Sequence, residues 1–262
     1  MSIFLGLVLL SLTIVWSAVF RSAPTQTSDQ ADSDMQGEDY VADGVLVSVS
    51  ELSITAQRAK AYPGSLMTIE KELPAGDTFD RYIASYQSEG LKIYGLLAVP
   101  QGEAPSGGWP VIIFNHGYIP PDEYISTQKY VAYVAALARA GYVVFMSDYR
   151  GHGESEGQAA GGYGSAAYTT DVLNAVASLK TYPGVSPDKI GMWGHSMGGF
   201  ITLRSMVISS EIDVGVIWAG VVASYPDLLN NWRRSSSTPP PLPSGARRWR
   251  ENLMTTFGTP QE

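Results

Sequence analysis

The sequence contains no cysteine and only three histidines, and both shortages narrow the chemistry open to it. Without cysteine there is no thiol nucleophile, no thiolate metal site and no disulfide, although the redox compartment stays undetermined. The histidines, at positions 116, 152 and 195, are scattered and lack the spacing of metal ligands. The glycine-rich stretch 151–164 lacks the Lys-Ser/Thr ending of a phosphate-binding loop. We therefore expect no metal and no cofactor.

Basic residues are also scarce, 17 against 25 acidic ones, which gives a net charge of −8. This charge argues against nucleic acid or an anionic membrane surface as a partner, because both would repel the protein. The 262 residues are 45% hydrophobic and 16% charged, a composition typical of a globular chain with one main domain.

The N-terminus carries an uncharged apolar run over residues 3–20, about the minimum length that spans a bilayer. A small-residue cleavage pattern is poor there, so residues 1–21 are predicted to be a single-pass membrane anchor, with a cleaved secretion signal as the alternative. Arg21, the only basic flank, would favour a cytoplasmic C-terminal side, yet we expect the following domain to be extracytoplasmic. Residues 22–44 are polar and acidic and are predicted to form a flexible tether.

The rest of the chain alternates apolar strands with amphipathic helices, which indicates an α/β domain over residues 45–226 with a mostly parallel sheet covered on both faces. Strands are expected over 82–86, 91–99, 111–114, 142–146, 190–193 and 214–223, and helices over 130–140, 171–180 and 199–207. The first two strands are separated by Gln87-Ser88-Glu89-Gly90 and are predicted to form an antiparallel hairpin.

The segment Gly194-His195-Ser196-Met197-Gly198 is a Gly-x-Ser-x-Gly motif between a strand and a helix, which is the setting of a nucleophile elbow. The sharp turn lifts the serine hydroxyl above the sheet, and glycines two residues before and after it avoid a Cβ clash. The Met197 amide, at the start of the helix, then faces any developing oxyanion.

Three segments together resemble the α/β-hydrolase superfamily, and most closely its prolyl-oligopeptidase-like serine hydrolases of the dipeptidyl aminopeptidase or acylaminoacyl-peptidase type. They are Asn115-His116-Gly117-Tyr118, the stretch from Asp148 to Ser155, and the stretch from Gly191 to Gly199. The resemblance covers roughly Tyr82 to Ala223. It implies an α/β-hydrolase fold and acyl transfer on a peptide or a small ester. A peptidase is the favoured interpretation; a carboxylesterase or lipase-like enzyme and a non-catalytic binding module are the alternatives.

The resemblance also implies roles for individual residues. Ser196 is the expected nucleophile, and the amides of Met197 and Tyr118 are the expected oxyanion hole. The supporting residues are His116, Gly117, Gly194 and Gly198. Asp148 and Arg150 are expected to brace their loop. His195 is expected to project away from Ser196, and His152 to be hydrogen-bonded in its loop or exposed to solvent.

A general base is missing from this set, because no histidine follows Ser196. The family order is Ser, then Asp or Glu, then His, so we expect the acid and the base beyond residue 262, and a chain that is a fragment and is inactive on its own. The strand at 214–223 is apolar on both faces, with no later strand to pair with it. The alternative is that His152 acts as the base and Asp227 as the acid, which would require an unusual excursion of the loop that carries His152.

Residues 227–262 are predicted to be part of a lid, with a Ser/Pro-rich linker at 235–245. The tryptophans and arginines of residues 227–262 are predicted to form a solvated amphipathic face. The alternative is that they bind a carboxylate group of the substrate. The sequence makes no prediction of an oligomeric state.

Overall fold

The structure is a computed structural model that describes residues 38–42, 45–49 and 51–223. The first two segments, β1 (Glu38–Ala42) and β2 (Val45–Val49), pair as an antiparallel hairpin. β1 therefore occupies the last part of the segment predicted as a tether, whose earlier residues lie outside the described ones. The predicted lid, residues 227–262, lies outside them as well, and the domain boundaries stay predictions.

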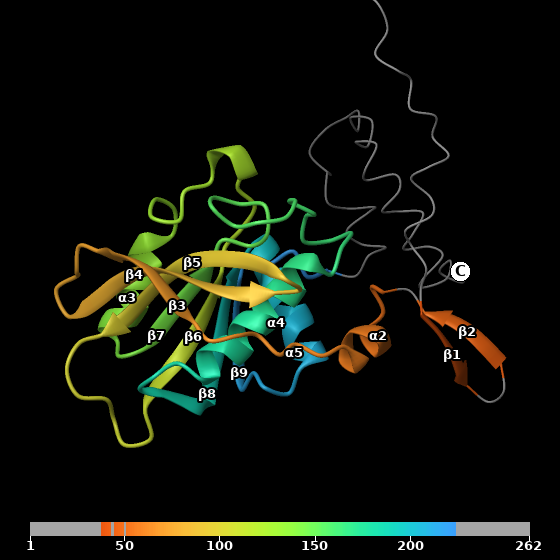
Figure 1. Ribbon diagram of the computed structural model, residues 1–262, viewed down its shortest axis with the longest axis horizontal. Coiled ribbons are helices and arrows are strands. Elements are labelled where there is room, and N and C mark those ends of the chain that lie inside the picture. The colour runs from red at the N-terminus through yellow and green to blue at the C-terminus, as the bar shows by residue number, and fades with distance from the viewer. Residues whose placement is uncertain (1–37, 43–44, 50, 224–262) are drawn as a thin grey trace, which may run out of the picture. The chain divides into compact units, whose positions relative to one another are not determined.

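Seven further strands form one sheet in the order β3-β4-β5-β7-β6-β8-β9 (Figure 1). An antiparallel meander of β3 (Thr68–Leu73), β4 (Phe79–Ser88) and β5 (Leu91–Pro100) makes up one side. The other side is parallel and consists of β7 (Val143–Ser147), β6 (Trp109–Asn115), β8 (Val185–His195) and β9 (Val214–Trp218). β5 joins the two sides by pairing antiparallel with β7. The predicted hairpin is confirmed.

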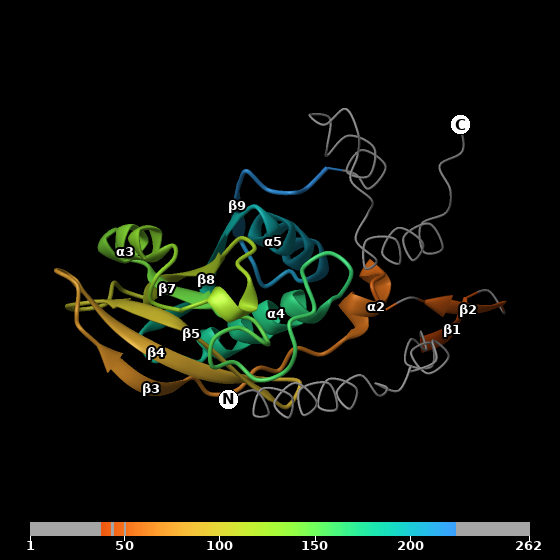
Figure 2. The same cartoon turned by 90° about the horizontal axis from the view of Figure 1, so that it is seen from above.

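Helices cover both faces of this sheet. α3 (Val131–Arg139) packs on one face, whereas α4 (Ala167–Lys180) and α5 (Met197–Ile208) lie next to each other on the other face (Figure 2). Two shorter helices, α2 (Ile54–Ala59) and the 3-10 helix η1 (Pro121–Glu123), complete the described elements. The predicted α/β class, with helices on both faces, is confirmed.

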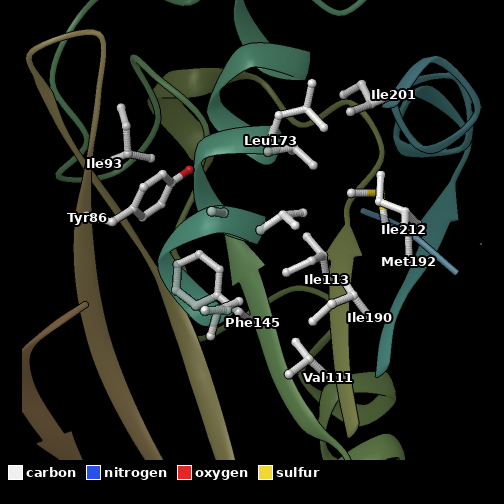
Figure 3. Packing of buried hydrophobic residues seen from close by; sticks show 14 of the residues in the cluster. Tyr86, Ile93, Val111, Ile113, Phe145, Leu173, Ile190, Met192, Ile201 and Ile212 are labelled. Carbon is white, nitrogen blue, oxygen red and sulfur yellow. The ribbon is translucent and has the colours of Figure 1, made fainter. Parts of the chain in front are cut away.

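Alternation along the strands explains the two layers of core. In β7, Val143 and Phe145 enter the cluster under α4 and α5, while Val144 and Met146 enter the cluster under α3. Successive side chains of a strand point to opposite faces, so a fully apolar strand serves both layers. Figure 3 shows part of the larger cluster, to which α4 contributes Leu173, α5 contributes Ile201, and the sheet contributes residues such as Ile113 and Phe145.

The structure extends or shortens several predicted elements. α4 begins at Ala167, four residues earlier than predicted, and Tyr168 in its first turn stacks on Tyr149 with ring centroids 4.8 Å apart. β3 was not predicted, because its sequence TIEKEL is polar and almost all of it is exposed on a sheet edge. β9 ends at Trp218, and among the described strands it forms the opposite edge.

The predicted membrane anchor and extracytoplasmic location require correction. No helix in the part of the chain that the structure describes is both long and apolar enough to cross a bilayer. The longest, α4, has 14 residues and reaches about 21 Å at about 1.5 Å per residue, short of a hydrocarbon core of about 30 Å. Residues 3–20, on which the prediction rested, lie outside the described residues, and we withdraw the membrane location.

Candidate active site

Three turns follow the ends of the parallel strands β6, β7 and β8 at one edge of the sheet. Asn115 at the end of β6 is in register with Gly194 of β8, so the turn at 115–118 lies beside the turn that carries Ser196. Asp148 directly follows β7, the other neighbour of β6. In open α/β sheets this carboxyl edge is where ligands bind.

Ser196 sits in a strained backbone conformation between β8 and α5. Its φ of 54° and ψ of −118° lie where a side chain costs about 1–3 kcal/mol. The amide of Ser196 donates to the Trp218 carbonyl at 3.1 Å, and its carbonyl accepts from the amides of Gly199 at 3.0 Å and Val221 at 3.2 Å. These bonds join the serine to β9, to α5 and to the chain after β9, and so they hold the strained turn in place.

Glycines on both sides of Ser196 allow the chain to pack closely. A Cβ at Gly198 would lie 2.7 Å from the His116 carbonyl oxygen and still closer to that of Asn115. A Cβ at Gly194 would lie 2.6 Å from the carbonyl carbon of Gly198 and nearer still to the Thr202 hydroxyl. Neither position has room for a side chain, because α5 presses its first turn against the end of β6.

Side chains hold the neighbouring turn at 115–118. Tyr149 donates its hydroxyl proton to the His116 carbonyl at 3.1 Å. The Nδ1 of His116 lies 2.7 Å from the Gly117 carbonyl oxygen, and the Gly117 amide donates to the Tyr130 hydroxyl at 3.2 Å. The amide of Tyr118 donates no hydrogen bond to any residue within 51–223, and neither does that of Met197 at the N-terminus of α5.

His116 is fully buried between aromatic rings. Its ring stacks on Tyr149 at 4.3 Å and on Tyr124 at 4.8 Å, and burial lowers the pKa of His116 from 6.5 to about 3, with the nearby His152 adding to the effect. The neutral ring therefore carries its proton on Nδ1, toward the Gly117 carbonyl, and leaves a buried Nε2 with no partner among the described residues.

The other two histidines make no hydrogen bond with the Ser196 hydroxyl. His152 is buried against the rings of Tyr124, Tyr168 and His116, not in solvent; its Nδ1 lies 3.3 Å from the Arg150 carbonyl, and burial lowers its pKa. The Nδ1 of His195 is 2.8 Å from the Tyr130 hydroxyl, and its ring lies 4.9 Å from that of Trp218.

Asp148 and Arg150 tie the loop after β7 to its surroundings. Asp148 accepts hydrogen bonds from Tyr124 at 2.9 Å and Ser126 at 2.5 Å, and burial raises its pKa from 3.8 to about 6. Arg150 makes an ion pair with the buried Asp171 at 2.8 Å and also reaches Glu89. Burial works against the charge of Arg150, but the Asp171 and Glu89 carboxylates raise its pKa above the ordinary value.

No described residue forms a hydrogen bond with the Ser196 hydroxyl. The described residues include all three histidines, and each is held by other groups. Asp227, the acid of the remote His152 alternative, lies outside the described residues. No cluster of potential metal ligands occurs in residues 38–42, 45–49 and 51–223.

A family model described as "Serine aminopeptidase, S33" matches residues 110–260, more than half of the chain. The chain belongs to this family of α/β-hydrolases. The matched part of the chain includes the turn at 115–118 and the turn that carries Ser196. The family assignment is coarser than the resemblance drawn from the sequence, whose prolyl-oligopeptidase-like type is not established by it.

Individual relatives are more distant. Over 125 residues, 31% are identical to thiohydrolase aneE of Aspergillus aculeatus, covering 47% of this chain and 36% of that protein. Over 145 residues, 28% are identical to the uncharacterized peptidase YtmA of Bacillus subtilis, covering 53% and 51%. The chain thus spans between about a sixth and a half of the length of the curated relatives it matches.

A solved structure supports the fold. The acetyl xylan esterase from Paenibacillus sp. R4 superimposes with a TM-score of 0.53 at 18% identity, over 78% of this chain and 66% of that one. At this identity the likeness shows a shared fold only, and together with the family match it confirms the predicted α/β-hydrolase fold of the chain.

Sequence reasoning missed the tyrosines that surround the turn, Tyr124, Tyr130 and Tyr149, and the buried partner of Arg150, Asp171. Tyr149 lies in the motif from Asp148 to Ser155, but the motif does not indicate what its hydroxyl binds, and the other three residues belong to no recognisable motif. Tyr130 does stand directly before a helix where a capping Ser, Thr, Asp or Asn is common, but a tyrosine there does not indicate what its hydroxyl binds.

Proposed function

We propose that the protein is a serine peptidase that works by acyl transfer, with Ser196 as nucleophile and the amides of Met197 and Tyr118 as oxyanion hole. The observation that carries the proposal is the strained backbone of Ser196, held next to a turn with an unpaired amide. Backbone strain at a non-glycine residue and unpaired backbone amides both lower the stability of the fold. Strained residues of this kind cluster at active sites, where the unusual geometry serves the reaction.

In the proposed reaction, Ser196 Oγ adds to the carbonyl carbon of the scissile bond and gives its proton to a general base. The carbonyl oxygen becomes negative and accepts hydrogen bonds from the two amides, each of which contributes about 3 kcal/mol in enzymes of this kind. The C–N bond then breaks, and the amine leaves with the proton from the base. Water adds to the acyl-enzyme and releases the acid and free Ser196.

None of the three histidines is proposed as the base. His116 and His152 are buried and neutral, and each has its Nδ1 toward a backbone carbonyl. His195 has its Nδ1 engaged with Tyr130. A base must come within hydrogen-bond reach of the serine hydroxyl, so we assign this role to a group outside the described residues.

Amide substrates are favoured by the family description and by the similarity to a protein named as a peptidase. The prolyl-oligopeptidase-like type belongs to the same proposal. Hydrolysis of esters or thioesters is the second candidate, favoured by the similarity to a thiohydrolase. Both candidates use the same acyl transfer and differ only in the leaving group.

A fluorophosphonate probe tests the nucleophile in the full-length protein. We expect covalent labelling on the peptide that contains Ser196, no labelling of Ser196→Ala, and unchanged labelling of Ser209→Ala, a serine at the other end of α5. A folded protein that stays unlabelled would instead support the binding-module alternative. A panel of aminoacyl amides against p-nitrophenyl esters and acyl thioesters then separates the two candidate substrate classes by their kcat/KM.

A further inference from the structure

The turn at 116–118 contains two consecutive peptide groups, and side chains hold three of their four polar groups. In the first peptide, the His116 carbonyl accepts from Tyr149 and the Gly117 amide donates to Tyr130. In the second, the Gly117 carbonyl accepts from the His116 ring. Only the Tyr118 amide is left without a partner in the described part of the chain.

Because peptide groups are planar, the hydrogen bonds of the His116 carbonyl, the Gly117 amide and the Gly117 carbonyl also restrict the direction of the Tyr118 amide. No cis peptide occurs among the described residues, and in a trans peptide the C=O and N–H groups point in opposite directions. The two peptides meet at the Gly117 Cα, and glycine allows a wide range of backbone angles. The direction of the Tyr118 amide therefore depends on how both planes are fixed, and the first plane is fixed at Gly117 N by Tyr130.

Tyr130 connects this turn to the elbow. Its hydroxyl accepts from the Gly117 amide at 3.2 Å and lies 2.8 Å from Nδ1 of His195, the residue before Ser196. A Cβ at Gly117 would lie 2.8 Å from this hydroxyl and 3.1 Å from Nδ1 of His195, so the three groups are in close contact. The Tyr130 backbone is itself strained, with a φ of 61° at the residue that precedes α3.

We propose that Tyr130 is a positioning residue for the oxyanion hole: its hydroxyl ties the Gly117 amide to the His195 imidazole and so fixes the Tyr118 amide relative to Ser196 and Met197. This inference rests on the proposed function and adds to it a residue outside every motif of the sequence. Tyr130 does not touch the substrate in this proposal; it acts through the backbone of the turn.

The ring of Tyr130 also packs, and its packing must be separated from its hydrogen bonds. The ring lies 5.6 Å from Phe114 and 6.3 Å from Tyr133 and His116. Tyr130→Phe keeps this packing and removes only the hydroxyl. Tyr133→Phe is the matched control. Tyr133 lies in the first turn of α3, its ring packs against those of Tyr130 and Phe114, and its hydroxyl has no hydrogen bond to a described residue.

The test uses the full-length protein with p-nitrophenyl acetate as substrate and a fluorophosphonate as probe. We expect Tyr130→Phe to lower kcat by about 10-fold to 100-fold, because a misplaced oxyanion donor loses much of its effect, with KM changed by less than about 2-fold. The rate of fluorophosphonate labelling should fall in parallel. Tyr133→Phe should match the wild type in both measurements.

His195→Ala removes the imidazole that contacts the Tyr130 hydroxyl, and it should also lower kcat. In Tyr130→Phe/His195→Ala the two losses should not multiply, because both variants remove one connection. Should Tyr130→Phe fail to fold, His195→Ala with an unchanged melting temperature still decides the matter.

Wild-type kcat in folded Tyr130→Phe, or an equal loss in Tyr133→Phe, would overturn the inference while leaving Ser196 as nucleophile. Wild-type protein that neither hydrolyses the ester nor labels at Ser196 would overturn the proposed function and this inference with it. The first result requires an active wild type, so the two failures are distinguishable.

Discussion

The two turns of the candidate site are held by different means. The elbow around Ser196 is shaped mainly by the backbone: Gly194 and Gly198 leave no room for a side chain, and backbone hydrogen bonds hold the serine. The turn at 116–118 is shaped by side chains that come from other elements, namely Tyr130 before α3 and Tyr149 after β7. We therefore expect the elbow to be disrupted by substitutions that add atoms. The neighbouring turn should instead be disrupted by substitutions that remove side-chain hydrogen bonds.

The largest expected effect follows from adding one carbon to the elbow. Gly198→Ala should lower the free energy of unfolding by more than about 4 kcal/mol, because the new Cβ meets carbonyl groups of Asn115 and His116 that cannot move aside. Urea unfolding at neutral pH measures this. Gly90→Ala is the control: its φ is +78° but nothing lies within 4 Å of a Cβ, so it should cost only about 1 kcal/mol. An equal loss of unfolding free energy in Gly198→Ala and Gly90→Ala would mean that the elbow is not limited by close backbone packing.

A smaller effect should appear in acid, under the neighbouring turn. The pKa of His116 is lowered from 6.5 to about 3 by burial, so below pH 6.5 the unfolded chain binds a proton that the native protein does not. By itself, this titration removes about 2 kcal/mol of stability between pH 6.5 and 4.5. Asp148 opposes it: its pKa is raised to about 6, so the native protein binds a proton first and gains stability as the pH falls from 6 toward 4.

Urea unfolding across this pH range separates the two groups. His116→Phe should remove the loss in acid, so that stability between pH 6.5 and 4.5 stays constant or rises. Asp148→Asn should make the loss steeper than in the wild type. An unchanged pH dependence in His116→Phe would mean that this ring is not kept neutral by its surroundings.

The smallest expected effect concerns a hydrogen bond that links the turn at 115–118 to α5, the helix after the elbow. Asn115 Nδ2 donates to the Thr202 hydroxyl of α5 at 2.8 Å, and both side chains are buried. Thr202→Val should cost about 1–2 kcal/mol by leaving the amide unpaired, whereas Thr202→Ser keeps the acceptor and should cost less. The fluorophosphonate labelling rate should stay near the wild-type value in both. A large loss of labelling in Thr202→Val alone would mean that the elbow, too, depends on a side-chain hydrogen bond.

The same contrast explains how much the sequence could predict. The elbow is local: the glycines and the serine lie within five residues, so one motif predicts the strand, the turn and the helix. The parallel strands were also predictable, because an apolar run such as 143–146 indicates a strand buried on both faces. Polar edge strands such as β3 carry no such pattern and were missed.

Side-chain contacts between distant residues were not predictable. Gly117 and Tyr130 are 13 positions apart, and Tyr130 and His195 are 65 apart. Burial was equally hidden: His152 lies in a glycine-rich loop that reads as exposed, yet its ring is enclosed by aromatic side chains. Such pairs depend on how helices and strands come together, which no local pattern specifies.

The buried carboxylate of Asp171 has a consequence for the order of assembly. It accepts hydrogen bonds from Ser88 on β4 and from Arg150 on the loop after β7, residues that precede it by 83 and 21 positions. During synthesis the β4–β5 hairpin therefore emerges from the ribosome long before its partner on α4 exists. The Ser88 hydroxyl therefore keeps its hydrogen bonds to water until α4 has been synthesised and brings Asp171 to the sheet.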